Sequence, residues 1–320
     1  MTETDPLKQL AQLEGYNTIR ADHVRQMQLL RYWADELATP RHADPKRLLR
    51  YGFKTYSQSD EDGIIQEIFN RVGTGNRTFV EFGVESGIEC NSVKLLVEGW
   101  RGLWLEGSAP RIAQIHKNFQ AFLDERRLAV NEAFVAAENI NALLEQGGVT
   151  GEIDFLSIDI DNNDYWVWKA ITVIQPRVVV IEYNAALHPP LSLVVPYDPA
   201  RKWDGSNYFG ASLEALVRLG RSKGYRIVGC NFSGANAFFV RDDIAGNHFL
   251  DPATAEEHYE PPRYFFPMLK GRARAAARAV RRRLKRYQRP SHFGSRFSMK
   301  AAMPSSASRA SIFSTITSDV

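Results

Sequence analysis

The sequence predicts an α/β protein built on a Rossmann-like, seven-stranded, mostly parallel sheet with helices on both faces and one antiparallel strand. Seven short apolar runs rich in β-forming residues lie between residues 51 and 243. Helical segments alternate with the first five runs, which is the pattern of a parallel sheet covered on both faces. The last two runs are separated only by FSGAN at 232–236, which predicts a hairpin and therefore one antiparallel strand.

The expected strands are continuous apolar runs because both faces of such a sheet are buried. In chain order they span 78–84, 103–106, 128–134, 153–160, 178–183, 225–230 and 237–240. The expected helices span 59–73, 92–99, 110–124 and 137–145, then a segment that begins at Asp164, and then 212–224. Ser59 and Asp62 resemble a capping box at the start of the first of these helices.

The segments that flank this central region differ from it in composition. Apolar residues at helical spacing predict a helical N-terminal extension over residues 1–50. Residues 51–250 form the predicted α/β domain. Residues 251–320 are broken by a Pro-Pro pair, then basic, then rich in Ser and Ala, which predicts a C-terminal tail that is partly disordered.

The formal net charge of +3 conceals an uneven distribution. Between Lys270 and Arg289 there are ten Lys or Arg residues and no acid, so the rest of the chain has 30 basic and 37 acidic residues, a net charge of −7. This pattern predicts an acidic globule with one basic arm, and it disfavours sequence-specific binding of nucleic acid. For the arm, three interpretations stay open: a solvated tail, peripheral contact with an anionic membrane through residues 270–289, and RNA binding.

Cysteine content and the N-terminal sequence bear on the compartment. Cys90 and Cys230 are the two cysteines, so no disulfide framework is present and a reducing compartment is expected. The first residues, MTETDPLKQL, lack the positive charge and apolar core of a signal peptide. No run of about 18 apolar residues occurs. We therefore expect a cytoplasmic protein, peripheral at the inner face of the membrane if the basic arm binds lipid; its oligomeric state is left open.

The first predicted strand ends in the pattern E-x-G-x-x-x-G, formed by Glu81, Gly83 and Gly87. Glycines at a strand-to-helix turn allow a tight turn and a close approach of the backbone to a ligand. The dinucleotide fingerprint G-x-G-x-x-G is not met, because residues 83–88 read GVESGI. A leading acid would repel a pyrophosphate and suits a ligand with an amino or sulfonium group. The alternative is a plain turn whose glycines serve geometry alone.

The second predicted strand ends at Glu106, 19 residues after Gly87. Rossmann-like folds hold ribose hydroxyls with an acid at this place, since one carboxylate accepts two O–H bonds. The alternative is an exposed acid at a strand end. The E-x-G-x-x-x-G pattern and an acid at the expected spacing after it together support a ligand site more strongly than either feature alone.

The segment SIDIDNNDYWVW places Asp159, Asp161 and Asp164 within six residues at the end of the fourth strand. Asp159 and Asp161 share side-chain parity if the strand continues through them, so both are expected on one side. Asp164 falls at the start of the next helix, where an acid also serves as a cap or first-turn residue. The fifth strand ends with Glu182 and, two residues later, Asn184, which are expected to border the same cleft.

These segments together resemble the FkbM-type, class I S-adenosylmethionine-dependent methyltransferases, and more narrowly the branch often found with surface-polysaccharide genes. The resemblance covers roughly residues 51–241, and the runs that carry it are SQSDEDGII, VEFGVESGIECNS, GWRGLWLEGS, LSIDIDNNDYWVW and VVVIEYN. It implies S-adenosylmethionine (SAM) as cofactor. Glu81, Gly83 and Gly87 would line its methionine part, and Glu106 would hold its ribose. For Asp159 two interpretations stay open, a structural role and a place on the cofactor side of the cleft.

The sequence departs from this family at two positions. Ser86 stands where an Asp is common, and Asn162 stands where these relatives usually carry Gly. Asn is among the few other residues that tolerate a positive φ, so we expect the turn at Asn162 to be retained.

Two active roles for the acids stay open. Metal-dependent methyltransferases of the catechol type place an acid after the fourth strand and an acid–amide pair after the fifth. By this analogy Asp161, Glu182 and Asn184 would bind a divalent cation such as Mg²⁺, which would lower the pKa of a substrate hydroxyl. In the competing interpretation Asp161, Asp164 or Glu182 acts as a carboxylate general base.

The leading functional prediction is O-methylation of a hydroxyl on a glycan or cell-surface precursor, with the glycan implied by the resemblance alone. The alternative is a non-catalytic, methyltransferase-like binding module in a glycan-assembly complex. A nucleic-acid methyltransferase is disfavoured, because His188-Pro189-Pro190 follows the fifth strand and lacks the residues of the (N/D)PP(Y/F) turn that such enzymes carry after the fourth.

Overall fold

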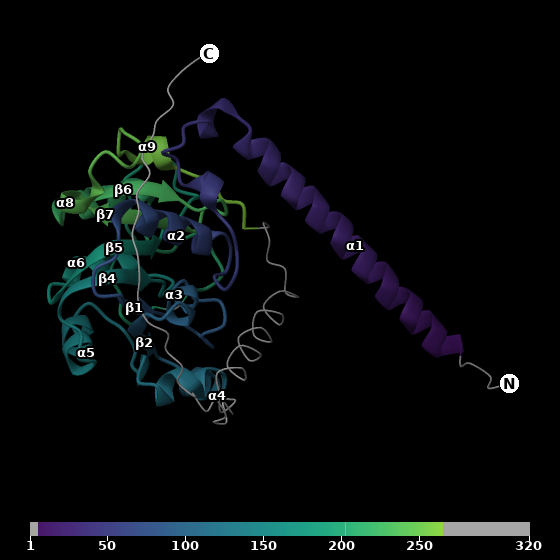
Figure 1. Cartoon of the computed structure of the whole chain (residues 1–320), viewed down its shortest axis with the longest axis horizontal. Helices are drawn as coiled ribbons and strands as arrows, with labels where there is room; N and C mark the ends of the chain where they lie inside the picture. The colour runs from purple at the N-terminus through teal and green to yellow at the C-terminus, as the bar shows by residue number, and fades with distance from the viewer. Residues whose placement is uncertain (1–5, 202, 265–320) are drawn as a thin grey trace, which may run out of the picture.

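The computed structural model describes residues 6–201 and 203–264, and within them seven strands form one sheet in the order β3-β2-β1-β4-β5-β7-β6 (Figure 1). The first five strands pair in parallel, whereas β7 runs antiparallel to both of its neighbours. The predicted fold class is therefore confirmed. The strands are β1 (Thr78–Phe82), β2 (Arg101–Glu106), β3 (Leu128–Glu132), β4 (Gly151–Ile158), β5 (Ile174–Glu182), β6 (Tyr225–Cys230) and β7 (Asn236–Arg241).

Helices cover both faces of this sheet, as the continuous apolar strands require. One buried cluster joins the sheet to α5 (Ile140–Gln146), α6 (Asp164–Ala170) and α7 (Leu213–Ser222). A second cluster, on the other face, joins it to α2 (Glu61–Val72), α3 (Val93–Val97), α4 (Ala109–Asp124) and α8 (Asp242–Ala245).

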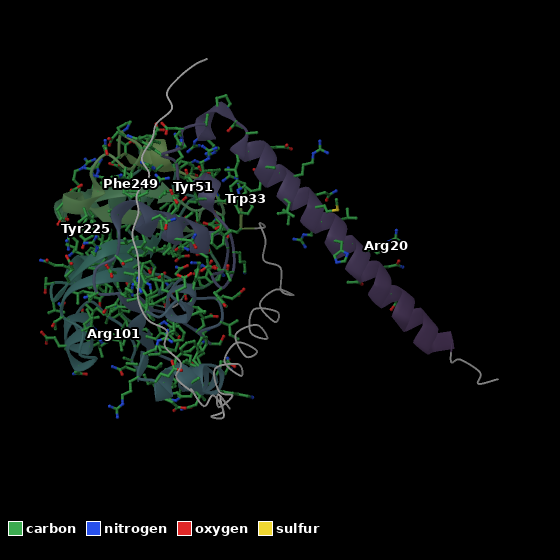
Figure 2. The ribbon with its side chains drawn as sticks, viewed as in Figure 1. Arg20, Trp33, Tyr51, Arg101, Tyr225 and Phe249 are labelled. Atoms are coloured by element: carbon green, nitrogen blue, oxygen red, sulfur yellow. The ribbon has the colours of Figure 1, made fainter. Side chains whose placement is uncertain are left out.

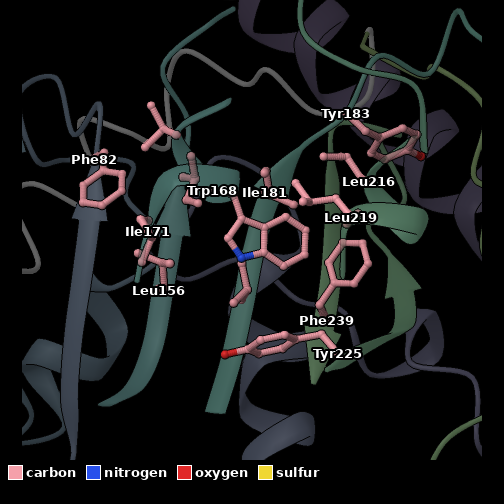
Figure 3. Packing of buried hydrophobic residues seen from close by; sticks show 14 of the residues in the cluster. Phe82, Leu156, Trp168, Ile171, Ile181, Tyr183, Leu216, Leu219, Tyr225 and Phe239 are labelled. Carbon is pink, nitrogen blue, oxygen red and sulfur yellow. The ribbon is translucent and has the colours of Figure 1, made fainter. Parts of the chain in front are cut away.

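Trp168 lies at the centre of the first cluster. Figure 3 shows its indole between Ile181 of β5 and Phe239 of β7, with Tyr225 beside it. The Trp168 and Phe239 ring centroids are 5.0 Å apart. Rings of this size bury 150–250 Å² each, so they contribute strongly to the packing of α6 on the sheet. This packing fixes helix α6, which begins at Asp164 shortly after Asp159 and Asp161.

The carboxyl ends of β1, β4 and β5 lie side by side, because β1 pairs with β4 and β4 pairs with β5. Along the sheet, the chain proceeds from β1 to β2 and β3 in one direction, and it then returns to the other side of β1 to form β4 and β5. Ligands of such sheets bind at the carboxyl edge of this switch point between β1 and β4. The turns after these strands therefore define where a site is expected.

Strand β4 ends at Ile158, earlier than the sequence predicts, and Asp161 adopts a φ of +69°. Asp159 and Asp161 thus lie in a turn, so the parity argument that assumed a continuing strand was wrong. The left-handed residue is Asp161 and not Asn162, so the expectation of a positive φ at Asn162 was wrong. Aspartate tolerates this conformation better than most residues.

The start of α2 carries three consecutive buried acids, and the expected Ser59–Asp62 capping box is not formed. Asp62 Oδ2 instead accepts the backbone N–H groups of residues 55–57 at 2.5–2.9 Å. Glu61 accepts the side-chain amides of Asn231 and Asn236, and Asp60 accepts the N–H of Phe232. These acids connect α2 to the β6–β7 hairpin, a long-range contact that sequence-local capping rules do not anticipate.

Helix α1 (Pro6–Leu37) contacts the rest of the molecule through its C-terminal end and otherwise points away from the sheet (Figures 1 and 2). Leu29, Trp33 and Leu37 pack against the cluster that contains Phe232, and the Trp33 and Phe232 rings stack with centroids 5.5 Å apart. Figure 2 shows Arg20 far from the domain and Trp33 at its edge.

Residues 251–264, at the start of the predicted tail, include α9 (Ala255–His258) and pack on the domain. Tyr183 donates to the backbone oxygen of Glu260, and Arg263 donates to that of Phe232. The basic arm and the rest of the tail lie outside the described residues. Within the described parts of the chain, no helix combines the length and apolarity needed to cross a membrane.

The buried acids at the start of α2 predict a pH-dependent stability. Burial, with repulsion from Glu61, raises the pKa of Asp60 from 3.8 to about 7. Between these values the folded state keeps a proton that the unfolded state has released, so stability is lost as the pH rises. From pH 5 to pH 7 the free energy of unfolding of the wild type should fall by about 2 kcal/mol relative to Asp60→Asn.

Urea denaturation across this pH range checks the prediction. Asp35→Asn, on the exposed surface of α1, serves as the control and should follow the wild type. Parallel pH profiles for the wild type and Asp60→Asn would show that Asp60 is ionised in the folded protein.

Candidate functional site

A cavity of about 750 Å³ opens at the carboxyl edge of the sheet. Its wall is formed by the turn after β1, the ends of β2, β3, β4 and β5, and the loop 183–212 between β5 and α7. This volume is within the range of about 300–1,000 Å³ that small-molecule sites occupy. The cavity lies where the strand order predicts a ligand site.

The structure brings most of the predicted site residues to this wall and leaves three away from it. Those on the wall are Glu81, Gly83, Glu106, Asp159, Asp161 and Glu182. Those that do not line it are Gly87, Asp164 and Asn184. Geometry places the residues, and their roles toward a ligand stay predictions.

Glu81 contributes to the cavity wall and also fixes the start of α3. Its carboxylate accepts the N–H groups of Asn91 and Ser92 at 2.8 and 2.9 Å, and it accepts the Ser92 hydroxyl. Burial raises the pKa of Glu81, and these three donors oppose that effect. The acid therefore shapes the turn after β1 whatever it binds.

Gly83 allows the turn after β1 to touch the turn after β4. It adopts a φ of +70°, and a Cβ there would lie 1.7 Å from the backbone oxygen of Asp159. Gly87 also has a positive φ, but a Cβ on it would meet the rings of Trp104 and Phe119. Gly83 thus allows the two turns of the site to approach each other, and Gly87 allows its own turn to pack against the core.

Glu106 lies at the end of β2 and is only 4% exposed, yet it lines the cavity. Its Oε2 accepts the N–H of Glu85 at 2.8 Å, and its Oε1 accepts the N–H of Ser108 at 2.9 Å. A carboxylate has about four lone-pair sites, so these two bonds leave acceptor capacity on both oxygens. Arg111, which pairs with Glu85 at 2.9 Å, approaches Glu106 within 3.9 Å.

Three carboxylates meet on the cavity wall at the neighbouring carboxyl ends of β4 and β5. Asp159, Asp161 and Glu182 can place one oxygen each within 4.8 Å of one another. In the described part of the chain, none of the three forms a side-chain hydrogen bond or an ion pair with a basic residue. Burial, and then repulsion from the neighbouring acids, raises the pKa of Asp159 and of Glu182 well above the usual range. Such a group favours a cation or a proton between its members.

Asp164 holds the backbone of the turn that carries Asp159 and Asp161, and it does not line the cavity. It is the first residue of α6, and its Oδ1 accepts the N–H of Ile160 at 2.9 Å, which closes the acidic turn. Its buried Oδ2 has no hydrogen-bond partner among the described residues. Burial raises the pKa of Asp164 to about 7. The position matches the first-turn interpretation more closely than a direct contact with a ligand.

Asn184 does not line the cavity, although it is only two residues from Glu182. Its side-chain amide donates to the backbone oxygens of Asn207 and Phe209 at 2.8 and 3.0 Å, and its oxygen accepts the N–H of Ala186. Asn184 therefore holds the loop 183–212. The geometry favours Asp159, and not Asn184, as the third member of a cation site.

Several wall residues were not singled out by sequence reasoning, among them Phe134 after β3, and Arg201 and Trp203 in the loop 183–212. Phe134 and Trp203 expose 56% and 55% of their surface. The loop has no periodicity that would place these residues, so residue type was the one available signal. His188 lies with its ring centroid 5.1 Å from that of Tyr259 and does not line the cavity.

No protein-family model and no curated protein matches the chain. Among solved structures, an O-methyltransferase from Bacillus cereus in complex with SAH is 15% identical, covers 67% of this chain and 87% of its own, and gives a TM-score of 0.38.

Two further solved structures give similar values. A SAM-dependent methyltransferase from Clostridium acetobutylicum is 11% identical, with 55% of this chain and 89% of its own covered and a TM-score of 0.35. The glycopeptide N-methyltransferase MtfA is 16% identical, with 55% and 94% covered and a TM-score of 0.34. Likeness of this degree leaves the reaction and substrate to be inferred from the residues of the chain itself.

The contact between Gly83 and Asp159 predicts a large effect of a single methyl group. Gly83→Ala should destabilise the protein by more than about 4 kcal/mol, because the Cβ meets a backbone atom that a side-chain rotation cannot move. Gly148→Ala is a matched control, since Gly148 has a φ of +72° in the left-handed turn that ends α5, with nothing within 4 Å. It should cost only about 1–2 kcal/mol for the left-handed conformation.

Urea denaturation of both variants measures the difference. Equal losses for Gly83→Ala and Gly148→Ala would mean that the turns after β1 and β4 are not in contact.

Proposed function

We propose that this protein is a SAM-dependent methyltransferase that methylates a hydroxyl group on a glycan or a related cell-surface precursor. The observation that carries the proposal is one cavity at the switch point, lined by Glu106 and by three carboxylates that have no basic partner among the described residues. The first feature suits a ribose and the second suits positive charge.

The residues present fit SAM in three respects. Glu106 keeps acceptor capacity for ribose hydroxyls after its two backbone bonds. Phe134 offers an exposed ring on the cavity wall against which a planar base can stack. Asp159 lines the same cavity and provides negative charge for an amino group or a sulfonium.

The chemistry requires little covalent help from the protein. When bound, SAM supplies a methyl group on a positively charged sulfur, and the acceptor oxygen bonds to that carbon as the carbon–sulfur bond breaks with its electron pair moving to sulfur. The proton of the acceptor hydroxyl passes to a carboxylate, for which Asp161 and Glu182 are placed on the cavity wall. The remaining contribution of the chain is alignment of the two partners and exclusion of water.

The carboxylate cluster supports two versions of this step. In the first, Asp159, Asp161 and Glu182 hold a divalent cation, since hard oxygen ligands suit Mg²⁺ and the cation would offset their repulsion. In the second, no metal is held and one carboxylate takes the proton directly. The raised pKa of Glu182 makes its carboxylate a stronger base than an ordinary carboxylate.

The assignment of Glu106 predicts a loss of cofactor affinity. Glu106→Ala should weaken binding of S-adenosylhomocysteine by roughly 10–150-fold, corresponding to about 1.5–3 kcal/mol for a hydrogen bond to a charged group. Glu106→Gln keeps one carbonyl oxygen for the backbone donors, so its affinity for S-adenosylhomocysteine should lie between that of the wild type and that of Glu106→Ala. Isothermal titration calorimetry on the full chain measures these affinities.

Thermal unfolding of each variant separates binding from folding, because Glu106 also accepts two backbone N–H groups. Unchanged affinity in a folded Glu106→Ala protein would refute the ribose assignment. No binding to the wild type in the micromolar range would refute the enzyme and leave the non-catalytic module.

The cation version predicts binding of Mn²⁺ or Mg²⁺ that depends on the cluster. Asp161→Asn should weaken Mn²⁺ binding by at least tenfold, whereas Asp35→Asn on α1 should not change it. Calorimetry in the absence of substrate gives this readout independently of activity.

Methyl transfer that is insensitive to EDTA, together with no measurable Mn²⁺ binding, would contradict the cation version. The carboxylate base would then be the remaining role for the cluster.

A further inference from the structure

The loop 183–212 forms a wall of the cavity that the cofactor assignment leaves unused. Arg201 and Trp203 are the residues of this loop that line the cavity. Both lie on the connection between β5 and α7, far from Glu106 in the sequence. Their side chains define what else the cavity can bind.

This loop is held in place by side chains from two neighbouring helical segments. Asn163 and Trp166, from the acidic segment, donate to the backbone oxygens of Asp198 and Val195 at 2.9 Å each. Tyr197 donates to Glu138 and accepts the N–H of Ala137. The turn that carries Asp159 and Asp161 is therefore connected to the loop 183–212. These bonds position the loop relative to the carboxylates.

Trp203 presents a large apolar ring in a fixed orientation. Its Nε1 donates to the backbone oxygen of Ser206 at 2.8 Å, and its ring meets that of Phe209 edge-on with centroids 6.5 Å apart. The residue is nevertheless 55% exposed. An exposed aromatic ring held in a cavity is a stacking surface, because covering it with the apolar face of a sugar or another ring is favourable.

Arg201 places one positive charge in a cavity dominated by acids. Its guanidinium lies over the Tyr208 ring at 5.2 Å, and no carboxylate of the described residues lies within 4.0 Å of it. Arg111, by contrast, is already paired with Glu85. A guanidinium of this kind binds a carboxylate or a phosphate in a bidentate manner.

These charges constrain the acceptor. Asp161 and Glu182 would repel a negatively charged acceptor, so such an acceptor needs a compensating cation on the same wall. Arg201 supplies that cation beside the Trp203 ring. A neutral acceptor would displace water from the guanidinium without supplying an anionic group to replace it, which costs free energy.

We propose that Arg201 and Trp203 form the acceptor subsite and select a sugar that carries a carboxylate or a phosphate near the hydroxyl that is methylated. Trp203 stacks on the sugar ring, Arg201 binds the anionic group, and the hydroxyl faces the carboxylate cluster. The proposal rests on the proposed methyltransferase function and specifies its substrate class.

Binding experiments on the full chain test this proposal. The probes are glucuronic acid, glucose 1-phosphate and neutral glucose, each titrated by saturation-transfer NMR with S-adenosylhomocysteine present. At least one anionic probe should bind at least tenfold more tightly than glucose, and the preferred probe identifies the anionic group. Arg201→Gln should remove this preference, while Arg218→Gln, a surface arginine paired with Glu214, should retain it.

The aromatic platform has its own variants. Trp203→Ala should weaken binding of the preferred probe at least tenfold, and Trp203→Phe should recover most of it because a ring is retained. Equal binding of glucose and both anions, or an anion preference that survives in Arg201→Gln, would overturn the proposal.

Failure of this subsite is distinguishable from failure of the proposed function. The affinity for S-adenosylhomocysteine should be unchanged in Arg201→Gln. If the wild type binds S-adenosylhomocysteine and no Arg201-dependent anion preference is found, the subsite is wrong and the methyltransferase stands. If anions bind through Arg201 and S-adenosylhomocysteine does not bind, the methyltransferase is wrong and the subsite stands.

Discussion

Repulsion between carboxylates at the ends of β4 and β5 is the constraint on which the candidate site depends. Asp159, Asp161 and Glu182 approach within 4.8 Å without a basic partner among the described residues. Like charges in a partly buried position raise one another's pKa values and oppose folding when they ionise. The backbone must therefore hold them together, and a ligand or a proton must complete them.

Backbone contacts around the acidic turn provide that restraint. Gly83 lets β1 pack directly on the Asp159 carbonyl, and Asp164 closes the turn through the N–H of Ile160. Trp168 fixes α6 to the sheet, which orients the turn that precedes it. Asn163 and Trp166 then extend the same rigid unit to the loop that carries Arg201 and Trp203. One short segment thus positions the acids and the opposite wall of the cavity together.

The fold could be predicted well from the sequence because its signals are local. Continuous apolar runs, intervening helical periodicity and the FSGAN turn specify the parallel sheet and its antiparallel strand without any knowledge of distant contacts. Glu106 was placed on the cavity wall for the same reason, since a residue at the carboxyl end of a strand in such a sheet has one destination.

Features that depend on contacts between distant segments were missed. Asn184 turns to Asn207 and Phe209, and Asp62 turns to residues 55–57, so neither occupies the place that sequence spacing indicated. Asp159 and Asp161 share a cavity through a left-handed turn and not through strand parity. Arg201 and Trp203 lie in a loop whose course is set by hydrogen bonds to other elements, which no periodic pattern records.

A crystal structure of the full chain grown with SAM tests this interpretation most directly. We expect the ribose hydroxyls about 3 Å from the Glu106 carboxylate, the base against Phe134, and the sulfonium on the side of Asp159. The acceptor half of the cavity, between the carboxylate cluster and Trp203, should stay free of cofactor. SAM bound anywhere other than beside Glu106 would contradict the site assigned to this protein, and so would crystals in which saturating SAM leaves the cavity without cofactor.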